Sequence, residues 1–181
     1  MRIRPSYAFY LSLTNNTFTA LEVGVREGYN ARQMMTLTDR LEKLILVDNY
    51  IGEFEKFEVG MLARLKPYWD RCVYHKLDSI SASKLIKDSS IDYLYIDGDH
   101  NELPVAADIE AWYPKVKTGG LMSGHDWWSE QVKKSVLTFA ATKKARLFAC
   151  QNMFSGIPIN PYEDEFMDWW FLKQERRKHE D

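Results

Sequence analysis

The sequence predicts an α/β fold with one mostly parallel β-sheet and helices on both of its faces. Apolar runs of strand length alternate with segments of helical periodicity from Thr17 to Cys150. Such alternation is typical of βαβ units with right-handed crossovers. An acidic residue also stands at the end of five successive apolar runs; these residues are Glu22, Asp48, Asp78, Asp97 and Asp126. Because ligands of open α/β sheets bind at the carboxyl ends of the strands, we expect one acidic rim there.

Seven strands are expected, each from a short run of mainly apolar residues. They cover residues 18–23, 44–47, 73–77, 91–96, a run that begins at Leu121, 147–150 and 168–172. The run 91–96 is nearly all apolar, which indicates a strand covered on both faces. The last strand follows a loop-like stretch, residues 151–165, with no helix before it. A strand reached without a crossover helix is most simply antiparallel, so we expect 168–172 to pair with 147–150 in that way.

The segments between the strands carry helical signals. Asn30, with Gln33 three residues later, resembles a capping box at the start of the first crossover helix. A short helix is expected over residues 81–87. Three further helices show apolar residues at helical spacing, and two of them stop at a proline. Their apolar faces are Phe54, Phe57, Met61, Leu62 and Leu65 before Pro67; Val105, Ile109 and Trp112 before Pro114; and Val132, Val136 and Phe139.

Length and composition indicate one domain over residues 1–181, with an N-terminal segment 1–16 and a charged tail 174–181. The net charge of -2, from 24 basic and 26 acidic residues, gives no basic field, so nucleic acid and membranes are not expected as partners. Cys72 and Cys150 lie in apolar runs and are expected to be buried free thiols, because their spacing fits neither a disulfide framework nor a zinc site. No signal peptide or membrane-spanning stretch is visible, so we expect a cytoplasmic location.

A glycine-bearing turn, Gly24 to Gly28, follows the first strand and precedes a helix. A dinucleotide fingerprint needs a third glycine so that the backbone can approach a pyrophosphate, and this turn lacks it. Glu22, two residues before the first glycine, instead favours a ligand whose amino and hydroxyl groups need acceptors. A tight strand-to-helix turn without a ligand explains the two glycines equally well.

The acidic residues after the next two strands have similar alternatives. Asp48, some twenty residues beyond the turn, is placed to accept hydrogen bonds from both hydroxyls of a ribose; a turn or cap residue is the alternative. Asp78 and Ser79 could meet an adenine amino group, or Asp78 could cap the next helix. A rim of carboxylates repels phosphate and attracts a cation, either an organic sulfonium or a metal ion.

The segment Asp97-Gly-Asp-His100, continued by Asp108, a Gly119-Gly120 turn and Gly124-His125-Asp126, makes the chain resemble a known family. Together with the glycine turn, Asp48 and the final Trp-Trp-Phe strand, it is similar to the class I S-adenosylmethionine-dependent methyltransferases. More narrowly, it resembles the small O-methyltransferase-like group around the macrocin-type and catechol O-methyltransferases. The resemblance covers residues 17 to 175 and implies a Rossmann-like seven-stranded sheet whose last strand is antiparallel.

The resemblance implies roles for individual residues. Glu22, Gly24 and Gly28 would border the methionine and ribose parts of S-adenosylmethionine, Asp48 would hold the ribose, and Asp78 with Ser79 would lie near adenine. Asp97 would face the sulfonium and the acceptor. In metal-dependent relatives, an acid after the fourth strand and a pair after the fifth bind magnesium. The corresponding residues are Asp97, His125 and Asp126; histidine departs from that pattern, because magnesium prefers oxygen ligands. A metal-free site and a softer divalent metal both remain open.

Methyl transfer to a hydroxyl also requires removal of a proton, which calls for a base or a metal. His100 and His125 are candidates because imidazole titrates near neutrality, and Asp97 and Asp99 are weaker ones. Alternatively, His100 is a helix-capping turn residue and His125 a packed, hydrogen-bonded ring. We therefore expect methyl transfer to a hydroxyl of a small molecule. The alternatives are a catalytically impaired or partner-dependent member of the fold, and an NAD-dependent oxidoreductase, which the missing third glycine disfavours.

The acceptor pocket is the least defined part of the site. Tyr29, Trp127 and Trp128 are candidates to wall it, although aromatic residues more often pack in the core. Residues 154–162 are a candidate lid. Because the chain has almost no extra N-terminal helices and no inserted domain, we expect the pocket to be shallow, or to be completed by a second subunit of a homo-oligomer.

Overall fold

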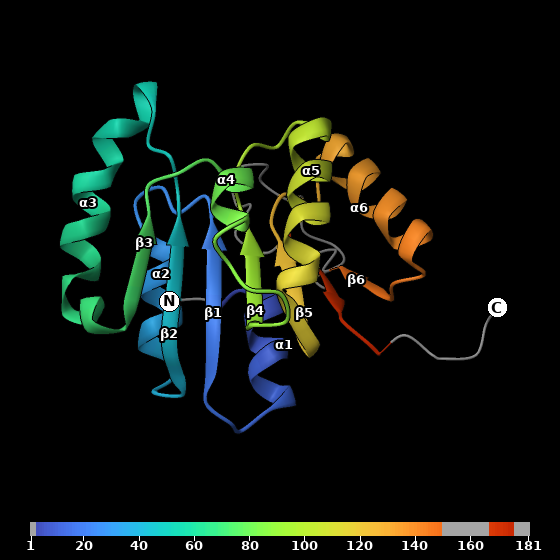
Figure 1. The fold of residues 1–181 in the computed structure, drawn as a ribbon, viewed down its shortest axis with the longest axis horizontal. Helices are drawn as coiled ribbons and strands as arrows, with labels where there is room; N and C mark the ends of the chain where they lie inside the picture. The colour runs from blue at the N-terminus through green and yellow to red at the C-terminus, as the bar shows by residue number, and fades with distance from the viewer. Residues whose placement is uncertain (1–2, 150–166, 176–181) are drawn as a thin grey trace, which may run out of the picture.

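The computed structural model describes residues 3–149 and 167–175, in which seven strands form one sheet (Figure 1). The strands are β1 (Phe18–Val23), β2 (Leu41–Val47), β3 (Cys72–His75), β4 (Ile91–Ile96), β5 (Val116–Gly124), β6 (Leu147–Ala149) and β7 (Trp169–Leu172). Their order across the sheet is β3-β2-β1-β4-β5-β7-β6. Strand β7 is antiparallel to β5 and β6, and all other neighbours are parallel. The predicted α/β class and the antiparallel last strand are therefore confirmed.

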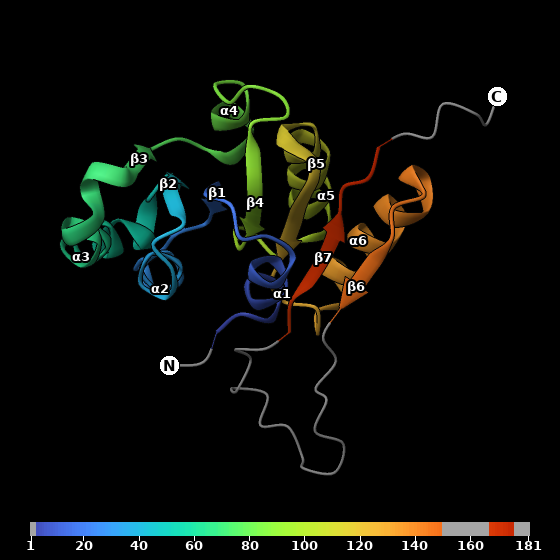
Figure 2. The same ribbon diagram turned by 90° about the horizontal axis from the view of Figure 1, so that it is seen from below.

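Helices cover both faces of the sheet (Figure 2). They are α1 (Pro5–Leu13), α2 (Tyr29–Leu37), α3 (Glu55–Leu65), α4 (Ser79–Ser83), α5 (Glu102–Trp112) and α6 (Glu130–Lys143), with short 3-10 turns η1 (Gly52–Phe54), η2 (Lys66–Arg71) and η3 (Tyr113–Lys115). One core cluster joins the sheet to α4, α5 and α6, and a second joins it to α1, α2 and α3. Strand β4 lies in the middle and is nearly all buried, as expected for a strand covered on both faces.

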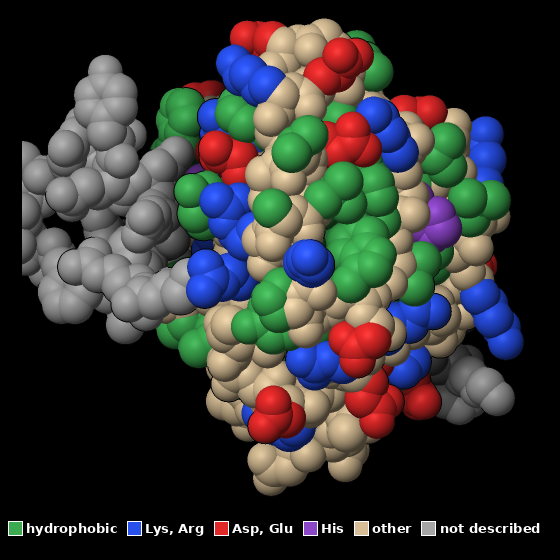
Figure 3. All heavy atoms as spheres, turned by 90° about the vertical axis from the view of Figure 1, so that its left-hand side faces the viewer, with side chains coloured by type: hydrophobic (Ala, Val, Ile, Leu, Met, Phe, Trp, Pro, Cys, Tyr) green, Lys and Arg blue, Asp and Glu red, His purple; other side chains and the backbone are tan. Residues whose placement is uncertain are grey.

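The predicted apolar faces of α5 and α6 are buried as expected. Val105, Ile109 and Trp112 pack in the core, as do Val132, Val136 and Phe139. The stripe on α3 is only partly correct. Met61 and Leu65 are fully buried, whereas Phe54 and Leu62 are 47% and 38% exposed. Phe54 and Leu62 are exposed apolar side chains of η1 and α3, as are Val59 of α3 and Trp69 of η2. Hydrophobic atoms gather in the middle of the face of the molecule that Figure 3 shows.

One prediction about a helix start is wrong, and one helix was not predicted. The capping box at Asn30 is absent, because α2 already begins at Tyr29 after Gly28, whose φ of +74° ends the turn. Asn30 therefore lies inside the helix, and its side chain bonds to Glu22 instead. Almost no extra N-terminal helices were expected, and the N-terminal segment contains one helix, α1. Pro5 at the first helical position preorganises the start, and the buried rings of Tyr7 and Tyr10 hold this helix against the sheet.

Several boundaries shift, and some predictions lie outside the described residues. Strand β2 starts three residues earlier than expected, and β3 ends at His75. The short helix covers 79–83 instead of 81–87, because Asp78 caps it. Cys72 is a partly buried free thiol, while Cys150, the loop 151–165, the candidate lid 154–162 and most of the tail 174–181 are not described. Among the residues that are described, no helix is long and apolar enough to cross a membrane.

Candidate functional site

A cavity of about 920 Å³ opens where the parallel strands end. All five predicted rim residues line it: Glu22, Asp48, Asp78, Asp97 and Asp126. Gly24, Tyr29, Ser79, His100 and His125 also face it. So do Asp108, which the sequence analysis named in the resemblance without giving it a role, and Arg4, which it did not single out. Gly28, Trp127 and Trp128 are not among its lining residues. Trp127 packs in the core instead, which was the alternative interpretation.

The glycine turn is held by backbone contacts. Gly24 has a φ of +80°, and a Cβ atom added to it would overlap the backbone of Asp97. Asp48 secures the rest of the turn, since its Oδ2 accepts from the amide of Arg26 at 2.8 Å and its Oδ1 from that of Tyr50 at 3.0 Å. Both of these residues have a positive φ, which is rare outside glycine and marks a conformation stabilised by its surroundings. The carboxylate of Asp48 therefore shapes the turn, and its remaining lone pairs are available to a ligand.

Glu22 is the most unusual charge in the cavity. It is 1% exposed, and Asn30 donates to its Oε1 at 3.0 Å. Its Oε2 is also buried and has no hydrogen-bond partner among the described residues. Burial raises the pKa of Glu22 to about 8. A buried acceptor without a partner is costly, so Glu22 requires a donor that residues 3–149 and 167–175 do not supply.

The side of the cavity near α4 contains a buried polar group. Asp78 caps α4 by accepting from the amide of Ser81, and this hydrogen bond lowers the pKa of Asp78. The Ser79 hydroxyl donates to Asp108 and accepts from the indole of Trp112 at 2.8 Å. Burial raises the pKa of Asp108 to about 6. A signal for Asp108 did exist, because it lies three residues after Val105 and four before Trp112, on the buried face of α5.

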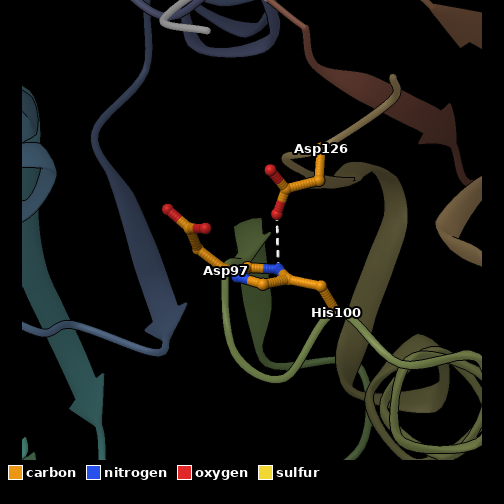
Figure 4. A group of neighbouring side chains, drawn as sticks. All are labelled: Asp97, His100 and Asp126. Atoms are coloured by element: carbon orange, nitrogen blue, oxygen red, sulfur yellow. Dashed lines mark ion pairs between the residues drawn. The ribbon is translucent and has the colours of Figure 1, made fainter. Parts of the chain in front are cut away.

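Two carboxylates and two histidines meet at the ends of β4 and β5. Figure 4 shows Asp97, His100 and Asp126 converging from the loops that follow these strands. Nδ1 of His100 contacts Oδ2 of Asp126, and Nδ1 of His125 lies 3.2 Å from Oδ1 of Asp126. The same His125 nitrogen is 3.7 Å from Oδ1 of Asp97. Asp126 has a φ of +57°, an unfavourable conformation for aspartate that persists because several contacts hold it.

The charges in this cluster shift one another. Burial alone would raise the pKa of Asp126, but hydrogen bonds from both histidines lower it well below its ordinary value. Burial alone would lower the pKa of His125, but its hydrogen bond with Asp126 and the charge of Asp97 raise it to about 9. The hydrogen bond with Asp126 likewise raises the pKa of His100. Burial raises the pKa of Asp97 above its ordinary value, although the charges of His125 and Arg4 oppose this. At neutral pH His125 is therefore a cation between two carboxyl groups.

Comparison with known proteins assigns the family. Residues 21–127, more than half of the chain, match the model of the family described as "Methyltransferase domain". The chain belongs to this methyltransferase family. A protein of Acanthamoeba polyphaga mimivirus called "Uncharacterized protein R132" is 29% identical over an alignment of 151 residues that covers 72% of this chain. The methyltransferase chain spans only 65% of that viral protein's length.

Two solved structures agree with the fold of this methyltransferase. A SAM-dependent O-methyltransferase from Thermotoga maritima superposes with a TM-score of 0.68 at 15% identity, covering 99% of this chain and 69% of that one. A putative rRNA-methylase from Clostridium thermocellum gives a TM-score of 0.69 at 13% identity, covering 96% and 98%. At such low identity these likenesses show the fold, which is that of the class I S-adenosylmethionine-dependent methyltransferases with a Rossmann-like sheet.

The fold implies S-adenosylmethionine, and the cavity of this methyltransferase fits that cofactor. The unpartnered Oε2 of Glu22 is a suitable acceptor for an ammonium group, and Asp48 offers acceptors for hydroxyls. Neither group suits a phosphate, because both are carboxylates. The lining residues therefore match a cationic nucleoside better than a dinucleotide.

One group of side chains could hold a metal ion. Among the residues described, Asp97, His100 and Asp126 offer ligand atoms that all lie within 4.8 Å of one another. The sequence suggested His125 as the third ligand; in the structure His100 joins the two carboxylates, and His125 contacts the same carboxylates. One imidazole with two carboxylates suits manganese, iron or zinc better than magnesium, which prefers an all-oxygen set.

Proposed function

We propose that this protein transfers a methyl group from S-adenosylmethionine to a hydroxyl oxygen of a small molecule. The observation that carries the proposal is the buried, unpartnered carboxylate oxygen of Glu22 in a cavity of about 920 Å³. A cationic amino group satisfies that oxygen, and a ligand with both an amino group and a ribose uses Glu22 and Asp48 together. A cavity of this size also accommodates a nucleoside ligand and a small acceptor.

The chain's own residues bind and orient the cofactor. Glu22 accepts from its ammonium group, and its second oxygen stays bonded to Asn30, which keeps the carboxylate in place. Asp48 accepts from ribose hydroxyls with the lone pairs that the glycine turn leaves available. Near α4, Ser79 and Asp108 supply further polar groups. The cofactor, when bound, supplies an electrophilic methyl group, and the enzyme's task is alignment and exclusion of water.

Removal of the acceptor's proton falls to Asp97. Because its pKa is about 9, His125 is already protonated at neutral pH and cannot take the proton from the acceptor hydroxyl. Its imidazolium instead stabilises negative charge that develops on the acceptor oxygen, and Asp126 holds it through Nδ1. His100 also contacts Asp126 and keeps that carboxylate oriented. A metal ion held by both side chains would replace this direct contact. Alanine at Asp97 should lower kcat more than alanine at His100, and equal losses would contradict this order.

A small molecule is favoured over nucleic acid as the acceptor. The net charge of the chain is -2, and the cavity is lined by many carboxylates. Nucleic-acid binding depends on neutralising phosphates with lysine and arginine, so an acidic mouth disfavours it. The likeness to an rRNA-methylase concerns the fold alone.

Two experiments test the proposal. Calorimetric titration with S-adenosylhomocysteine and with NAD compares the two nucleotide classes. Preferential binding of NAD would refute the proposal and favour an oxidoreductase. Transfer of labelled methyl groups to a library of hydroxyl compounds then tests turnover. Tight binding of S-adenosylhomocysteine without transfer to any acceptor would favour a catalytically impaired or partner-dependent protein, and size-exclusion chromatography would show whether it forms a homo-oligomer.

A further inference from the structure

Arg4 lies between two carboxylates and lines the cavity from outside the family-matched region. Its Nη2 is 4.0 Å from Oδ2 of Asp97, and its Nη1 is 3.9 Å from Oδ1 of Asp168. The guanidinium also lies over the ring of Tyr95, 5.6 Å from its centroid. The side chain is 18% exposed. A planar, permanently charged group that bridges two acids in this way is characteristic of arginine and is poorly reproduced by lysine.

The position of Arg4 is fixed by the helix that follows it. The amide of Ser6 donates to Oδ2 of Asp168 at 3.2 Å, and its hydroxyl donates to the same oxygen at 2.6 Å. Tyr95 donates to Oδ1 of Asp168 at 3.0 Å, and the Ser6 hydroxyl also meets that of Tyr93 at 2.9 Å. All four of these side chains are essentially fully buried. The start of α1 is therefore held against β4 and the entry to β7, and Arg4 is held with it.

Asp97 has a cation on each of its two oxygens. His125 faces Oδ1 at 3.7 Å, and Arg4 faces Oδ2 at 4.0 Å. Asp126, a second carboxylate, bonds to the same His125 as well as to His100, so without Arg4 the carboxylate of Asp97 would depend on a His125 imidazolium that it shares with Asp126. Like charges in a confined site repel each other, and the carboxylate of Asp97 would be free to turn towards solvent.

We propose that Arg4 is a positioning residue for methyl transfer, which holds the carboxylate of Asp97 in the orientation that the reaction requires. The N-terminal segment is then part of the active site, with Asp168 and Ser6 as its anchor. This inference rests on the proposed function, because it assigns Arg4 a role through Asp97.

The simpler alternative is that Arg4 only neutralises the buried Asp168. Asp168 is completely buried, so Arg4→Met alone would leave a charge there and could prevent folding. The double variant Arg4→Met/Asp168→Asn removes both charges and keeps an oxygen to accept from Ser6. It should be compared with Asp168→Asn alone, with Arg4→Lys, and with Arg71→Met, which removes an arginine bonded to the start of β2.

Four measurements should be made on the full chain: Tm, the Kd of S-adenosylhomocysteine, kcat and KM for the acceptor, and a crystal structure of the double variant. We expect the double variant to keep the Tm and the cofactor Kd of Asp168→Asn, while kcat falls at least about tenfold below that of Asp168→Asn. A displacement of about 1 Å can cost up to about a hundredfold in rate. Arg4→Lys should recover part of kcat, and Arg71→Met should leave kcat unchanged.

Several outcomes would overturn the inference. If the double variant turned over as fast as Asp168→Asn, Arg4 would be structural only. Equal kcat values for Arg4→Lys and the double variant would also contradict a role for its charge. If the wild-type protein transferred no methyl group, the proposed function would fail. The crystal structure of the double variant would still show whether Arg4 orients the carboxylate of Asp97. An Asp97 carboxylate that keeps its orientation without Arg4 would disprove the positioning role.

Discussion

The backbones of Gly24 and Asp97 pass so close together that a Cβ atom on Gly24 would stand 2.1 Å from the carbonyl oxygen of Asp97. The two residues follow the neighbouring strands β1 and β4, at the point where the cavity begins. The amide of Asp97 also donates to Val23, which immediately precedes Gly24. Gly24 is thus required by the packing of the sheet, independently of any cofactor.

Gly24→Ala should therefore be strongly destabilising. Gly119 provides a matched control, since it has the same φ of +80° but open space where a Cβ would lie. Gly119→Ala should cost only the conformational strain, about 1–2 kcal/mol. Gly24→Ala should cost the same strain plus the displacement of a backbone segment, for a total above about 3 kcal/mol. Urea unfolding of both variants measures the difference, and equal losses would mean that the contact with Asp97 relaxes without cost.

Glu22→Gln should weaken cofactor binding at least about tenfold, because the ammonium group loses its charged partner. Binding by the wild-type protein should also depend on pH. The pKa of Glu22 in the free protein is about 8, above its ordinary value of 4.5, so a cationic ligand must displace a proton to bind the carboxylate. Affinity for S-adenosylhomocysteine should therefore rise between pH 6 and 7.5 with release of a proton.

Titration calorimetry in buffers of different ionisation enthalpy measures that proton. Glu22→Gln should lose the pH dependence, whereas Glu42→Gln, on an exposed position of β2, should keep it. Binding by wild type that does not change over this pH range would show that the ligand leaves Glu22 protonated.

Ser79→Ala should destabilise the protein by about 1–3 kcal/mol, since buried Asp108 and Trp112 both lose their shared hydroxyl. The loss should be larger at pH 7 than at pH 5. Asp108 has a pKa of about 6 in the folded protein against 3.8 ordinarily, so stability falls as pH rises from about 4 to 6. The Ser79 hydroxyl offsets part of this cost by stabilising the ionised form.

Denaturant unfolding at both pH values tests this prediction. Ser90→Ala, which removes an exposed hydroxyl bonded to a backbone carbonyl, serves as the control and should change stability little. A loss for Ser79→Ala that is the same at pH 5 and pH 7 would indicate that Ser79 does not bond to the ionised carboxylate.

Metal binding should follow the donor set of Asp97, His100 and Asp126. We expect manganese or zinc to bind more tightly than magnesium, because one of the three ligands is an imidazole. His100→Ala should abolish this preference, and His75→Ala, on β3, should not. Calorimetry with each ion alone measures the order. Magnesium as the tightest ion, with no effect of His100→Ala, would contradict a role for His100 as a ligand.

The strands and the acidic rim could be predicted from the sequence because they depend on local patterns. Strand β4 appears as a nearly continuous apolar run, interrupted only by Asp92, and in a parallel sheet the residue after such a run, Asp97, must lie at the carboxyl edge. The same reasoning places Asp48 and Asp126 there. Their exact pairing is not local, however. Whether His100 or His125 joins the two carboxylates depends on how two loops fold towards each other.

The contribution of the N-terminal segment could not be predicted for the same reason. Asp168 bonds to Ser6 across 162 positions and to Tyr95 across 73, and no periodicity in the sequence connects them. Asn30 illustrates a different limit. Its type and spacing match a cap, but Gly28 with its positive φ already starts the helix, which leaves Asn30 for Glu22. The buried carboxylate of Glu22 needs a hydrogen-bond donor, and Asn30 supplies it instead of capping the helix.

The anchoring of α1 has a practical consequence for anyone who purifies the enzyme. An affinity tag fused ahead of Met1 would join the chain three residues before Arg4, whose guanidinium forms part of the cavity wall. We expect such a tag to crowd the entrance of the cavity or to disturb the contact between Ser6 and Asp168. The low turnover that results would reflect the tag and not the enzyme. Assays should accordingly use protein from which an added affinity tag has been cleaved.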